Sequence, residues 1–411
     1  MSTSTSREPE QFALAGPAAR ARPITTLKLM SDQAVPPVSF RADVLAVPAY
    51  RQGAAPTKPG YKLSSNENPF PPLPGVLDAI AQRADVNRYA AVAMPELRET
   101  IGAEFGVDGA HVHLAAGSVA ILFQLVHAAA GAGDEYLHAW PSFEAYPSLG
   151  LASGAVARRV PLTPSAEHDL DEMAAAITER TRVVLLCSPN NPTGPTIRRA
   201  DFDRFMTRVP ARTLVVLDEA YREFVTDPEA VRGEDVLRQH PNLVVLRTFS
   251  KAYGLAGLRI GYGVGDPAIF AAAASVAIPL SVTGIAESAA RASLTPEARA
   301  VHAERVAELT ERRDALAAAL RDLGLAIPQA QGNFVWIPET GETPGGVPDA
   351  LALAADFSEA GTLVRPFGGV GVRISVGEPE SVPVVIDIVR RHLEAIAYPA
   401  GRSTTHYTES R

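Results

Sequence analysis

The chain has 411 residues, of which 46% are hydrophobic and 20% are charged, and its formal net charge is −8 at pH 7. This length allows two domains with large cores, and the composition is typical of a globular protein. The acidic balance argues against nucleic acid as the main partner. No apolar run reaches the roughly 18 residues that a membrane helix needs, so we expect no membrane segment.

The chain has one cysteine, Cys187, in an apolar run. A nucleophilic thiol is one interpretation, but a small buried hydrophobic residue at a strand end is favoured. Because a second cysteine is missing, no intrachain disulfide can form. This pattern indicates a reducing, cytoplasmic compartment.

Asn-Glu-Asn-Pro at residues 66–69 is the first motif after a polar N-terminal stretch. Asn66 and Asn68 tolerate unusual backbone angles, and the proline stops any helix, so the motif predicts a loop at the entry to a domain. Tyr89 follows, just before a helix predicted over residues 94–105, and it is predicted to be an interface or surface aromatic residue.

Gly117, Ser118 and Val119 lie between a strand predicted at residues 112–115 and an apolar helix predicted at residues 121–129. Free N–H groups and the helix dipole at a helix start attract anions, and Ser118 adds a hydroxyl. A Gly-Ser turn by itself is a weak signal. In this strand, turn and helix order, it predicts an anion site.

Four further runs of residues predict strands at 135–139, 183–187, 214–217 and 243–246, and the last three of these runs are apolar. Each is followed by polar or aromatic residues, at the place where α/β sheets bind ligands. Phe143 follows the first run; it is either a core aromatic or a ring that stacks on a flat ligand.

Asn191 lies in the rigid loop Ser-Pro-Asn-Asn-Pro-Thr-Gly, residues 188–194, after the second run. The loop is either a plain turn or a frame that fixes an amide donor. Asp218 follows the third run, where it can cap a helix or pair with a protonated ring nitrogen. Tyr221 can donate a hydrogen bond to a phenolic oxygen.

The fourth run leads into Thr248, Ser250 and Lys251, followed by a loop of small residues that ends at Arg259. An ordinary surface lysine is one interpretation. The more specific one is that Lys251 forms a Schiff base with an aldehyde while Arg259 and the two hydroxyls hold a phosphate on the same molecule. Pyridoxal 5′-phosphate carries both groups.

The last third of the chain contains a long, Ala-rich helix predicted at residues 296–323, which would link two domains. Arg373 alternates with apolar residues in a predicted strand, which is common for solvent-facing arginines. His111 and His113 have no further ligands nearby in the sequence, so no metal site is expected. The other elements predicted here are strands at 259–263, 334–337 and 372–376 and a helix at 283–292.

In this order the motifs resemble the fold-type I, pyridoxal-phosphate-dependent aminotransferases, in the histidinol-phosphate aminotransferase branch. The resemblance covers about residues 38–398. It implies an α/β fold with a large cofactor-binding domain that contains a mostly parallel seven-stranded sheet, and a smaller α+β domain. The implied division is a disordered tail (1–35), an N-terminal segment of the small domain (36–75), the large domain (76–282), the rest of the small domain with its linker helix (283–398) and a second tail (399–411).

The resemblance also implies roles for individual residues. Lys251 would carry the cofactor and transfer protons, Asp218 would face the ring nitrogen, and Tyr221 the phenolic oxygen. The other residues implied to bind the cofactor are Gly117, Ser118, Val119, Phe143, Asn191, Thr248, Ser250, Arg259 and Tyr89, the last of them from the partner subunit of a homodimer. Arg373, Arg365 and Asn68 are implied to bind the substrate.

Val119 and Ala120 stand where histidinol-phosphate enzymes usually have Asp-Glu, and Ser-Phe-Glu-Ala-Tyr-Pro at residues 142–147 resembles the aromatic subgroup. The predicted function is therefore ping-pong transamination between a phenylalanine-type amino acid and a 2-oxo acid. Histidinol-phosphate transamination stays open as an alternative, with a decarboxylase relative in cobalamin synthesis behind it. A cofactor-binding regulator without turnover is the alternative from another class, but the short N-terminal tail leaves no room for its usual DNA-binding domain.

Overall fold

The computed structural model describes residues 38–47, 58–83, 85–90, 94–341 and 344–397, so the two predicted tails lie outside the described residues. The chain divides into two compact units, Met1–Ala46 and Val47–Arg411. The described part of the first unit contains a short helix, α1 (Ala42–Leu45), in which no residue is buried. The other described helices and strands belong to the second unit.

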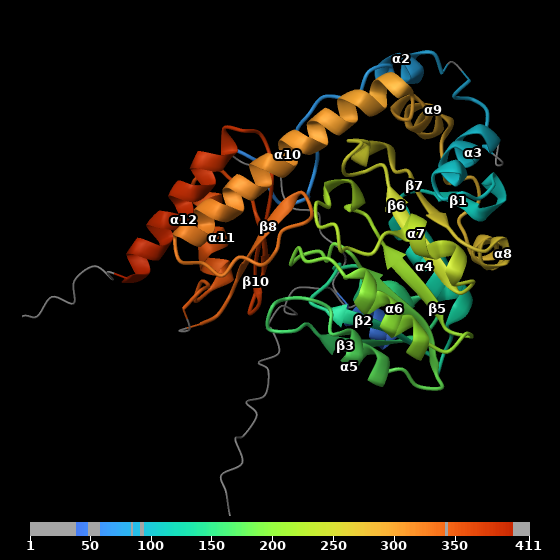
Figure 1. Cartoon of the computed structure of the whole chain (residues 1–411), viewed down its shortest axis with the longest axis horizontal. Helices are drawn as coiled ribbons and strands as arrows, with labels where there is room; N and C mark the ends of the chain where they lie inside the picture. The colour runs from blue at the N-terminus through green and yellow to red at the C-terminus, as the bar shows by residue number, and fades with distance from the viewer. Residues whose placement is uncertain (1–37, 48–57, 84, 91–93, 342–343, 398–411) are drawn as a thin grey trace, which may run out of the picture. The chain divides into compact units, whose positions relative to one another are not determined.

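A seven-stranded sheet with strand order β1-β7-β6-β5-β4-β2-β3 organises the second unit (Figure 1). Strands β6, β5, β4, β2 and β3 run parallel, and β7 is antiparallel to both β6 and β1. The predicted mostly parallel sheet is confirmed. Its strands are β1 (Val112–Ala115), β2 (Glu135–Trp140), β3 (Val156–Pro161), β4 (Thr181–Cys187), β5 (Leu214–Asp218), β6 (Leu243–Thr248) and β7 (Gly261–Val264).

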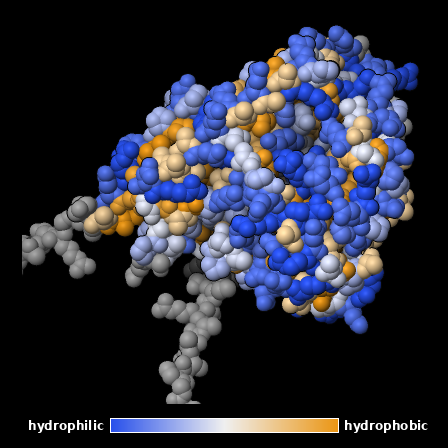
Figure 2. Space-filling model, viewed as in Figure 1, coloured by the Kyte–Doolittle hydropathy of each residue, from blue (hydrophilic) through white to orange (hydrophobic). Residues whose placement is uncertain are grey.

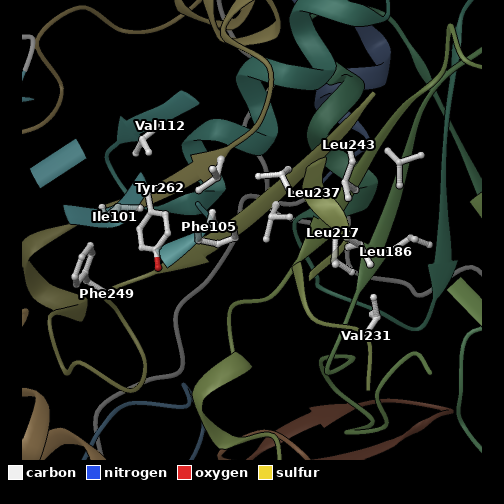
Figure 3. Close-up of a cluster of buried hydrophobic side chains, with 14 of the residues drawn as sticks. Ile101, Phe105, Val112, Leu186, Leu217, Val231, Leu237, Leu243, Phe249 and Tyr262 are labelled. Atoms are coloured by element: carbon white, nitrogen blue, oxygen red, sulfur yellow. The ribbon is translucent and has the colours of Figure 1, made fainter. Parts of the chain in front are cut away.

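Both faces of the central strands are apolar, which explains their unbroken hydrophobic runs. Along β4, Val183 and Leu185 belong to one hydrophobic cluster, while Val184 and Leu186 belong to another. The first cluster includes side chains of α4 (Ser118–Ala129) and α8 (Pro267–Ser275). The second includes side chains of α3 (Pro95–Glu104), α5 (Leu170–Ala175), α6 (Arg199–Arg208) and α9 (Gly284–Ser293), and Figure 3 shows part of it.

A second, antiparallel sheet has the strand order β8-β10-β9 and its own hydrophobic cluster. Leu63, from the N-terminal segment, is buried in this cluster. Its N–H donates to Leu363 O (2.7 Å), and its carbonyl accepts from Ser375 N–H (2.9 Å). The elements here are β8 (Phe334–Pro338), β9 (Arg365–Phe367), β10 (Gly371–Ser375), α11 (Ala350–Glu359) and α12 (Ser381–Ala397). These contacts agree with the smaller domain expected from two chain segments, although the domain boundaries stay predictions.

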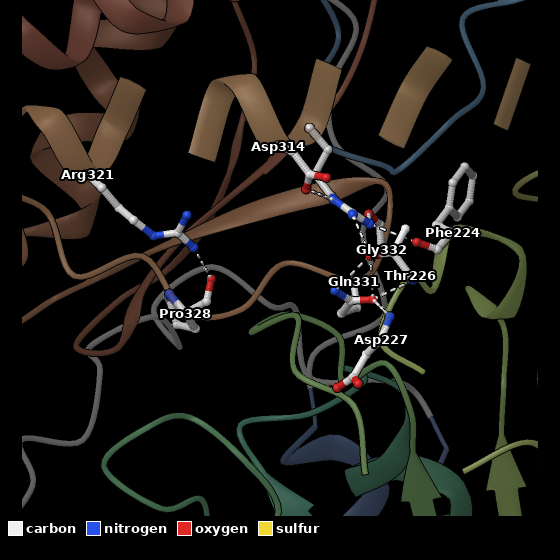
Figure 4. A network of polar contacts seen from close by, with 9 residues as sticks. Phe224, Thr226, Asp227, Asp314, Arg321, Pro328, Gln331 and Gly332 are labelled. Carbon is white, nitrogen blue, oxygen red and sulfur yellow. Dashed lines mark hydrogen bonds and ion pairs between the residues drawn. The ribbon is translucent and has the colours of Figure 1, made fainter. Parts of the chain in front are cut away.

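Helix α10 (Pro296–Asp322) contributes side chains to the hydrophobic clusters of both sheets. Ala298, near its start, belongs to the cluster on the large sheet, whereas Leu316 and Leu320 belong to the cluster of the small sheet. Between them lies Arg313, which is fully buried. Arg313 Nη1 donates to Phe224 O (2.8 Å) and Gly332 O (3.4 Å). Figure 4 labels both of these acceptor residues. The predicted linker helix is therefore present.

The strand predicted at residues 259–263 is wrong at its start. Arg259 has φ 54° and ψ 65°, in the left-handed region, after the 3-10 turn Ala256–Leu258. Strand β7 begins only at Gly261. The apolar pattern could not reveal this turn, because Leu258 and Ile260 flank Arg259 with the spacing of a strand.

Two further differences concern helices. The helix predicted at residues 121–129 starts earlier, at Ser118. Several elements of the structure were not predicted from the sequence. They are α2 (Val76–Ala81), α5, α6, α7 (Gly233–Val236), α8, α11, α12, β3 and β9.

The visible face of the molecule is mostly hydrophilic, with hydrophobic residues scattered among polar ones (Figure 2). Within the described residues, no helix combines the length and the apolar character needed to cross a membrane.

The burial of Arg313 makes a prediction about stability. Arg313→Met removes the donors to Phe224 O and Gly332 O. A buried carbonyl without a donor costs about 1–3 kcal/mol, so we expect the free energy of unfolding to fall by about 2–4 kcal/mol. Urea-induced unfolding followed by circular dichroism measures the change.

Arg321→Met is the matched control, because Arg321 also lies on α10 and also donates to two carbonyls, Ile327 O and Pro328 O. Arg321 is exposed, so water replaces the lost donors and little change is expected. Equal losses in the two variants would contradict the argument from burial.

Candidate active site

The candidate residues with the sharpest chemistry come from the carboxyl ends of three adjacent strands. Asn191 follows β4, Asp218 is the last residue of β5, and Lys251 follows β6. Because β4, β5 and β6 are parallel neighbours, their carboxyl ends lie at one edge of the sheet. The three loops therefore meet at one edge of the sheet, as expected.

The Lys251 amine lies in a mostly polar and positively charged setting. Its Nζ donates to Ser65 O (3.0 Å) and lies 5.9 Å from the centre of the Tyr221 ring. Burial, together with the positive charges of Arg373 and Arg259, lowers the pKa of Lys251 to about 7, against the opposing effect of Glu67. An amine with this pKa is partly unprotonated near neutral pH and can act as a nucleophile or base.

Asp218 is a buried carboxylate, only 4% exposed. Its Oδ2 accepts a hydrogen bond from Tyr146 Oη (3.0 Å), and Oδ1 accepts one from Ala220 N–H (3.3 Å). Burial raises the pKa of Asp218 to about 6, although the Tyr146 hydrogen bond opposes this shift. A buried acid with a raised pKa is a recurrent mark of a functional site. The Phe143 ring lies edge-on to Tyr146, with 5.6 Å between ring centres.

Tyr221 is also buried, and its hydroxyl oxygen accepts a hydrogen bond from Asn66 Nδ2 (2.9 Å). Asn66 is held in a left-handed conformation (φ 52°), and its Oδ1 accepts from Ser375 Oγ (2.8 Å). The Tyr221 proton is therefore available for donation to another acceptor. Burial raises the pKa of Tyr221, so its hydroxyl stays protonated.

The start of helix α4 provides N–H groups for an anion. The first N–H groups of a helix, here from Ser118 and Val119, have no acceptor within the helix. Gly117, the preceding residue, has φ 86°, a conformation that favours glycine. A Cβ at Gly117 would lie 2.5 Å from Arg259 Nη2. Glycine is therefore required for the Arg259 guanidinium to reach the helix start.

Arg259 brings hydroxyl groups to the same place. Its Nη1 donates to Ser250 Oγ (3.3 Å), and the Ser250 N–H donates to Thr248 Oγ1 (3.1 Å). The left-handed backbone at Arg259 aims the side chain back toward Gly117 and Ser250. A guanidinium, hydroxyl groups and a helix N-terminus together form a cradle with the chemistry of a phosphate site.

The two arginines predicted to bind substrate differ in their partners. Arg373, 5% exposed, donates from Nη1 to Asn191 Oδ1 (2.5 Å) and from Nη2 to Ser64 O (2.7 Å). The first bond engages the Asn191 amide oxygen and leaves its NH₂ group as a donor. Arg365 forms an ion pair with Glu144 instead, with Nη2 and Oε1 2.6 Å apart.

Two predicted residues are less directly connected to this group. Asn68 Nδ2 donates to Lys251 O (3.3 Å) and Ala252 O (2.8 Å), so it anchors the backbone of the lysine loop. Tyr89 is 83% exposed, and no side-chain contact links it to the other candidates within the described residues.

Cys187 is buried, and burial raises the pKa of its thiol to about 12, which disfavours a nucleophilic role.

Three residues that contact this group were not predicted to belong to the site: Asn66, Tyr146 and Glu144. Each lies in a motif that was recognised for another residue, Asn-Glu-Asn-Pro for Asn66 and Ser-Phe-Glu-Ala-Tyr-Pro for the other two. Their partners are Tyr221, Asp218 and Arg365.

The residues present fit pyridoxal 5′-phosphate. The Arg259 guanidinium, which the glycine at position 117 lets reach the start of α4, suits a phosphate, and the buried Asp218 carboxylate suits a ring nitrogen that carries a proton. The Lys251 amine, with its lowered pKa, suits an aldehyde.

Comparison with known proteins gives a consistent result. The chain is 47% identical to an aromatic amino acid aminotransferase of Streptomyces avermitilis, over 86% of this chain and 97% of the relative. A protein of the same name from Streptomyces coelicolor is also 47% identical, over 85% of this chain and 96% of the relative. The solved structure of histidinol-phosphate aminotransferase from Sinorhizobium meliloti, in complex with pyridoxal 5′-phosphate, matches with a TM-score of 0.75 and 26% identity, over 87% of this chain and 98% of that one.

The family described as aminotransferase class I and II matches residues 58–389, which include the predicted site residues. Its members depend on pyridoxal phosphate, in agreement with the cradle, the buried acid and the amine described above. The chain belongs to the class I and II aminotransferase family.

Proposed function

We propose that the chain transfers the amino group of an aromatic, phenylalanine-type amino acid to a 2-oxo acid, with pyridoxal 5′-phosphate as cofactor. The observation that carries this proposal is the convergence of the Lys251 amine, the buried Asp218 carboxylate and the Arg259 cradle at one sheet edge. The aromatic substrate is supported by relatives at 44–47% identity that bear the name aromatic amino acid aminotransferase.

The cofactor phosphate would be held by Arg259, by the hydroxyls of Ser250, Thr248 and Ser118, and by the N–H groups at the start of α4, including that of Val119. Gly117 leaves room for the Arg259 guanidinium at the start of α4. Phe143 would supply the aromatic surface beside the ring. When bound, the cofactor withdraws electrons from the α-carbon of the substrate.

Asp218 would hold a positive charge on the ring nitrogen of the cofactor by charge pairing. Tyr146 donates to the same carboxylate and keeps it oriented. Tyr221 and the NH₂ group of Asn191 would donate hydrogen bonds to the phenolic oxygen of the cofactor. The Lys251 amine would hold the cofactor through its aldehyde, and as a free amine it would move the proton at the substrate α-carbon, for which an amine of pKa about 7 is well matched.

The substrate carboxylate would bind Arg373, whose guanidinium is oriented by Asn191 and Ser64. Arg365 lies next to it on the neighbouring strand. Asn68 would contact the substrate from the N-terminal segment, where its side chain binds the backbone of the lysine loop.

We expect the active form to be a homodimer in the cytoplasm. Tyr89 is 83% exposed in the single chain and suits contact with the cofactor phosphate of a partner subunit. The one cysteine, a buried free thiol, is compatible with a reducing compartment.

Histidinol-phosphate transamination is the second candidate, because the Sinorhizobium meliloti structure shares the fold and because two adjacent arginines suit a phosphate. A regulator without turnover is a weaker candidate, because relatives at 44–47% identity bear the name of an aminotransferase.

The substrate can be tested by comparing kcat/KM for phenylalanine and for histidinol phosphate with one 2-oxo acid as acceptor. We expect phenylalanine to be preferred, because kcat/KM measures discrimination between substrates. A tenfold preference for histidinol phosphate, equivalent to about 1.4 kcal/mol in the transition state, would contradict the aromatic assignment but not the family.

Asp218→Asn keeps the shape of the side chain and removes its charge. The loss of a charged hydrogen bond costs about 1.5–3 kcal/mol, so kcat should fall about 10- to 150-fold, with a smaller change in KM. Tyr146→Phe, which removes one neutral donor to the same carboxylate, should lower kcat by no more than about tenfold. Wild-type kcat in Asp218→Asn would contradict the charge-pairing role.

Mixing Tyr89→Phe protein with Lys251→Ala protein tests the shared site. If Tyr89 serves the neighbouring subunit, a mixed dimer has one site with both residues intact and one site with neither. Activity above that of either variant alone is then expected. Unchanged activity, with subunit exchange verified by mass spectrometry, would place Tyr89 outside the partner's site.

A further inference from the structure

Glu219 and Arg247 form a buried ion pair that no step of the proposed reaction uses. Arg247 Nε donates to Glu219 Oε2 (2.9 Å), and Arg247 Nη2 lies 2.8 Å from the same oxygen. The side chain of Glu219 is 0% exposed, and that of Arg247 is 9% exposed. The guanidinium also lies over the ring of Phe105, 4.6 Å from its centre. Both charges are therefore largely shielded from water.

Further hydrogen bonds fix the orientation of the pair. Glu219 Oε1 accepts from the Gly233 N–H (2.7 Å), and Arg247 Nη2 also donates to Glu234 Oε2. The other oxygen of Glu234 accepts from Arg222 Nη2 (2.7 Å). Gly233 and Glu234 begin helix α7, and Arg222 begins the 3-10 turn that follows β5. Because both oxygens of each carboxylate are engaged, neither carboxylate can rotate without losing a hydrogen bond.

The position of the pair connects it to the active site. Asp218 and Leu246 are the last residues of β5 and β6 that pair with each other, and Glu219 and Arg247 come directly after them. The Glu219 N–H donates to Leu246 O (2.9 Å), which continues the pairing beyond the end of β5. The ion pair therefore joins the two strands next to Asp218, on the side from which the chain continues to Lys251.

Stability alone is a weak reason for this arrangement. Burial removes the hydration of both charges, and their mutual attraction does little more than offset that cost, so apolar side chains of similar size can stabilise a core equally well. Charged hydrogen bonds add a defined geometry between the groups that they join. The relevant geometry here is that between the Asp218 carboxylate and the Lys251 amine, because one rigid cofactor ring must meet both.

We infer that Glu219 and Arg247 are positioning residues, which hold the Asp218 carboxylate at the distance from Lys251 that the cofactor ring requires. The pair acts through the backbones of β5 and β6. This inference rests on the proposed roles of Asp218 and Lys251, and it is independent of which amino acid is the substrate.

The test follows the visible absorbance of the cofactor bound to Lys251 as a function of pH. A positive charge on the ring nitrogen, which Asp218 would maintain, lowers the pKa of the protonated nitrogen that joins the cofactor to Lys251. Glu219→Gln keeps the size of the side chain and removes its charge. We expect Asp218 to be displaced in this variant and the midpoint of the absorbance titration to rise by about 0.5–1 pH unit. A direct effect of the lost charge has the opposite sign, because removing a nearby carboxylate lowers the pKa of a cationic group.

Two more variants separate position from charge. Glu219→Gln combined with Arg247→Gln removes one charge of each sign, so the direct electrostatic effects oppose each other while the anchor is lost, and the titration midpoint should again rise. Because the double variant leaves no unpaired charge at these two positions, it also decides the question if Glu219→Gln alone fails to fold. Arg247→Lys keeps the positive charge but loses the planar fork, and it should give a smaller rise than the double variant.

Glu135→Gln is the matched control. Glu135 begins β2 in the same sheet, its side chain is 6% exposed, and it pairs with Arg158 (3.2 Å) and Arg180 (2.6 Å). Because β2 is parallel to β4 and β4 to β5, this strand start lies at the edge of the sheet opposite to Asp218. The midpoint of thermal unfolding should fall in this variant, while the absorbance titration should match that of the unmodified protein.

A titration midpoint that does not rise in either Glu219→Gln or the double variant would overturn the inference. If the thermal midpoint then falls as it does in Glu135→Gln, the ion pair is a structural bridge only. Failure of the proposed role of Asp218 has a different signature, because Asp218→Asn would then titrate like the unmodified protein.

Discussion

Apolar packing on both faces of the central strands is the constraint that the site depends on. Along β4, β5 and β6, alternate side chains enter clusters on opposite faces of the sheet, so a charged group within these strands would be buried without water. Polar chemistry is therefore confined to the strand ends. Because these strands are parallel neighbours, their ends bring Asn191, Asp218 and Lys251 to a common edge.

Burial at that edge shifts two ionisable groups in opposite senses. It raises the pKa of Asp218 and lowers the pKa of Lys251, because burial disfavours the charged form of each group. Arg373 and Arg259 strengthen the effect on the lysine by repulsion. The Asp218 carboxyl group and the Lys251 amine thus suit a ligand that carries a positive charge at one end and an electrophilic carbon at the other.

The strands and the residues at their ends could be predicted from the sequence, because a continuous apolar run followed by polar residues is a local pattern. Lys251, Asp218 and Asn191 all followed from it. The left-handed turn at Arg259 could not be predicted, because its apolar neighbours have the spacing of a strand.

Partners that lie far apart in the chain were missed for a different reason. Glu144 and Arg365 are 221 positions apart, and Tyr146 and Asp218 are 72 positions apart. No local pattern connects such pairs. The first pair depends on how the small sheet packs against the loop after β2, and the second on the order of the strands within the large sheet. A single sequence reveals neither.

Helix α10 has a consequence for how this chain can change over evolution. Because Ala298 belongs to one core while Leu316 and Leu320 belong to another, the helix is bound to both at fixed rotational positions. Inserting one residue between them would rotate everything downstream by about 100° and advance it by about 1.5 Å. The buried face would then turn toward solvent. The length of this segment is therefore expected to vary far less among descendants of this protein than the lengths of its surface loops.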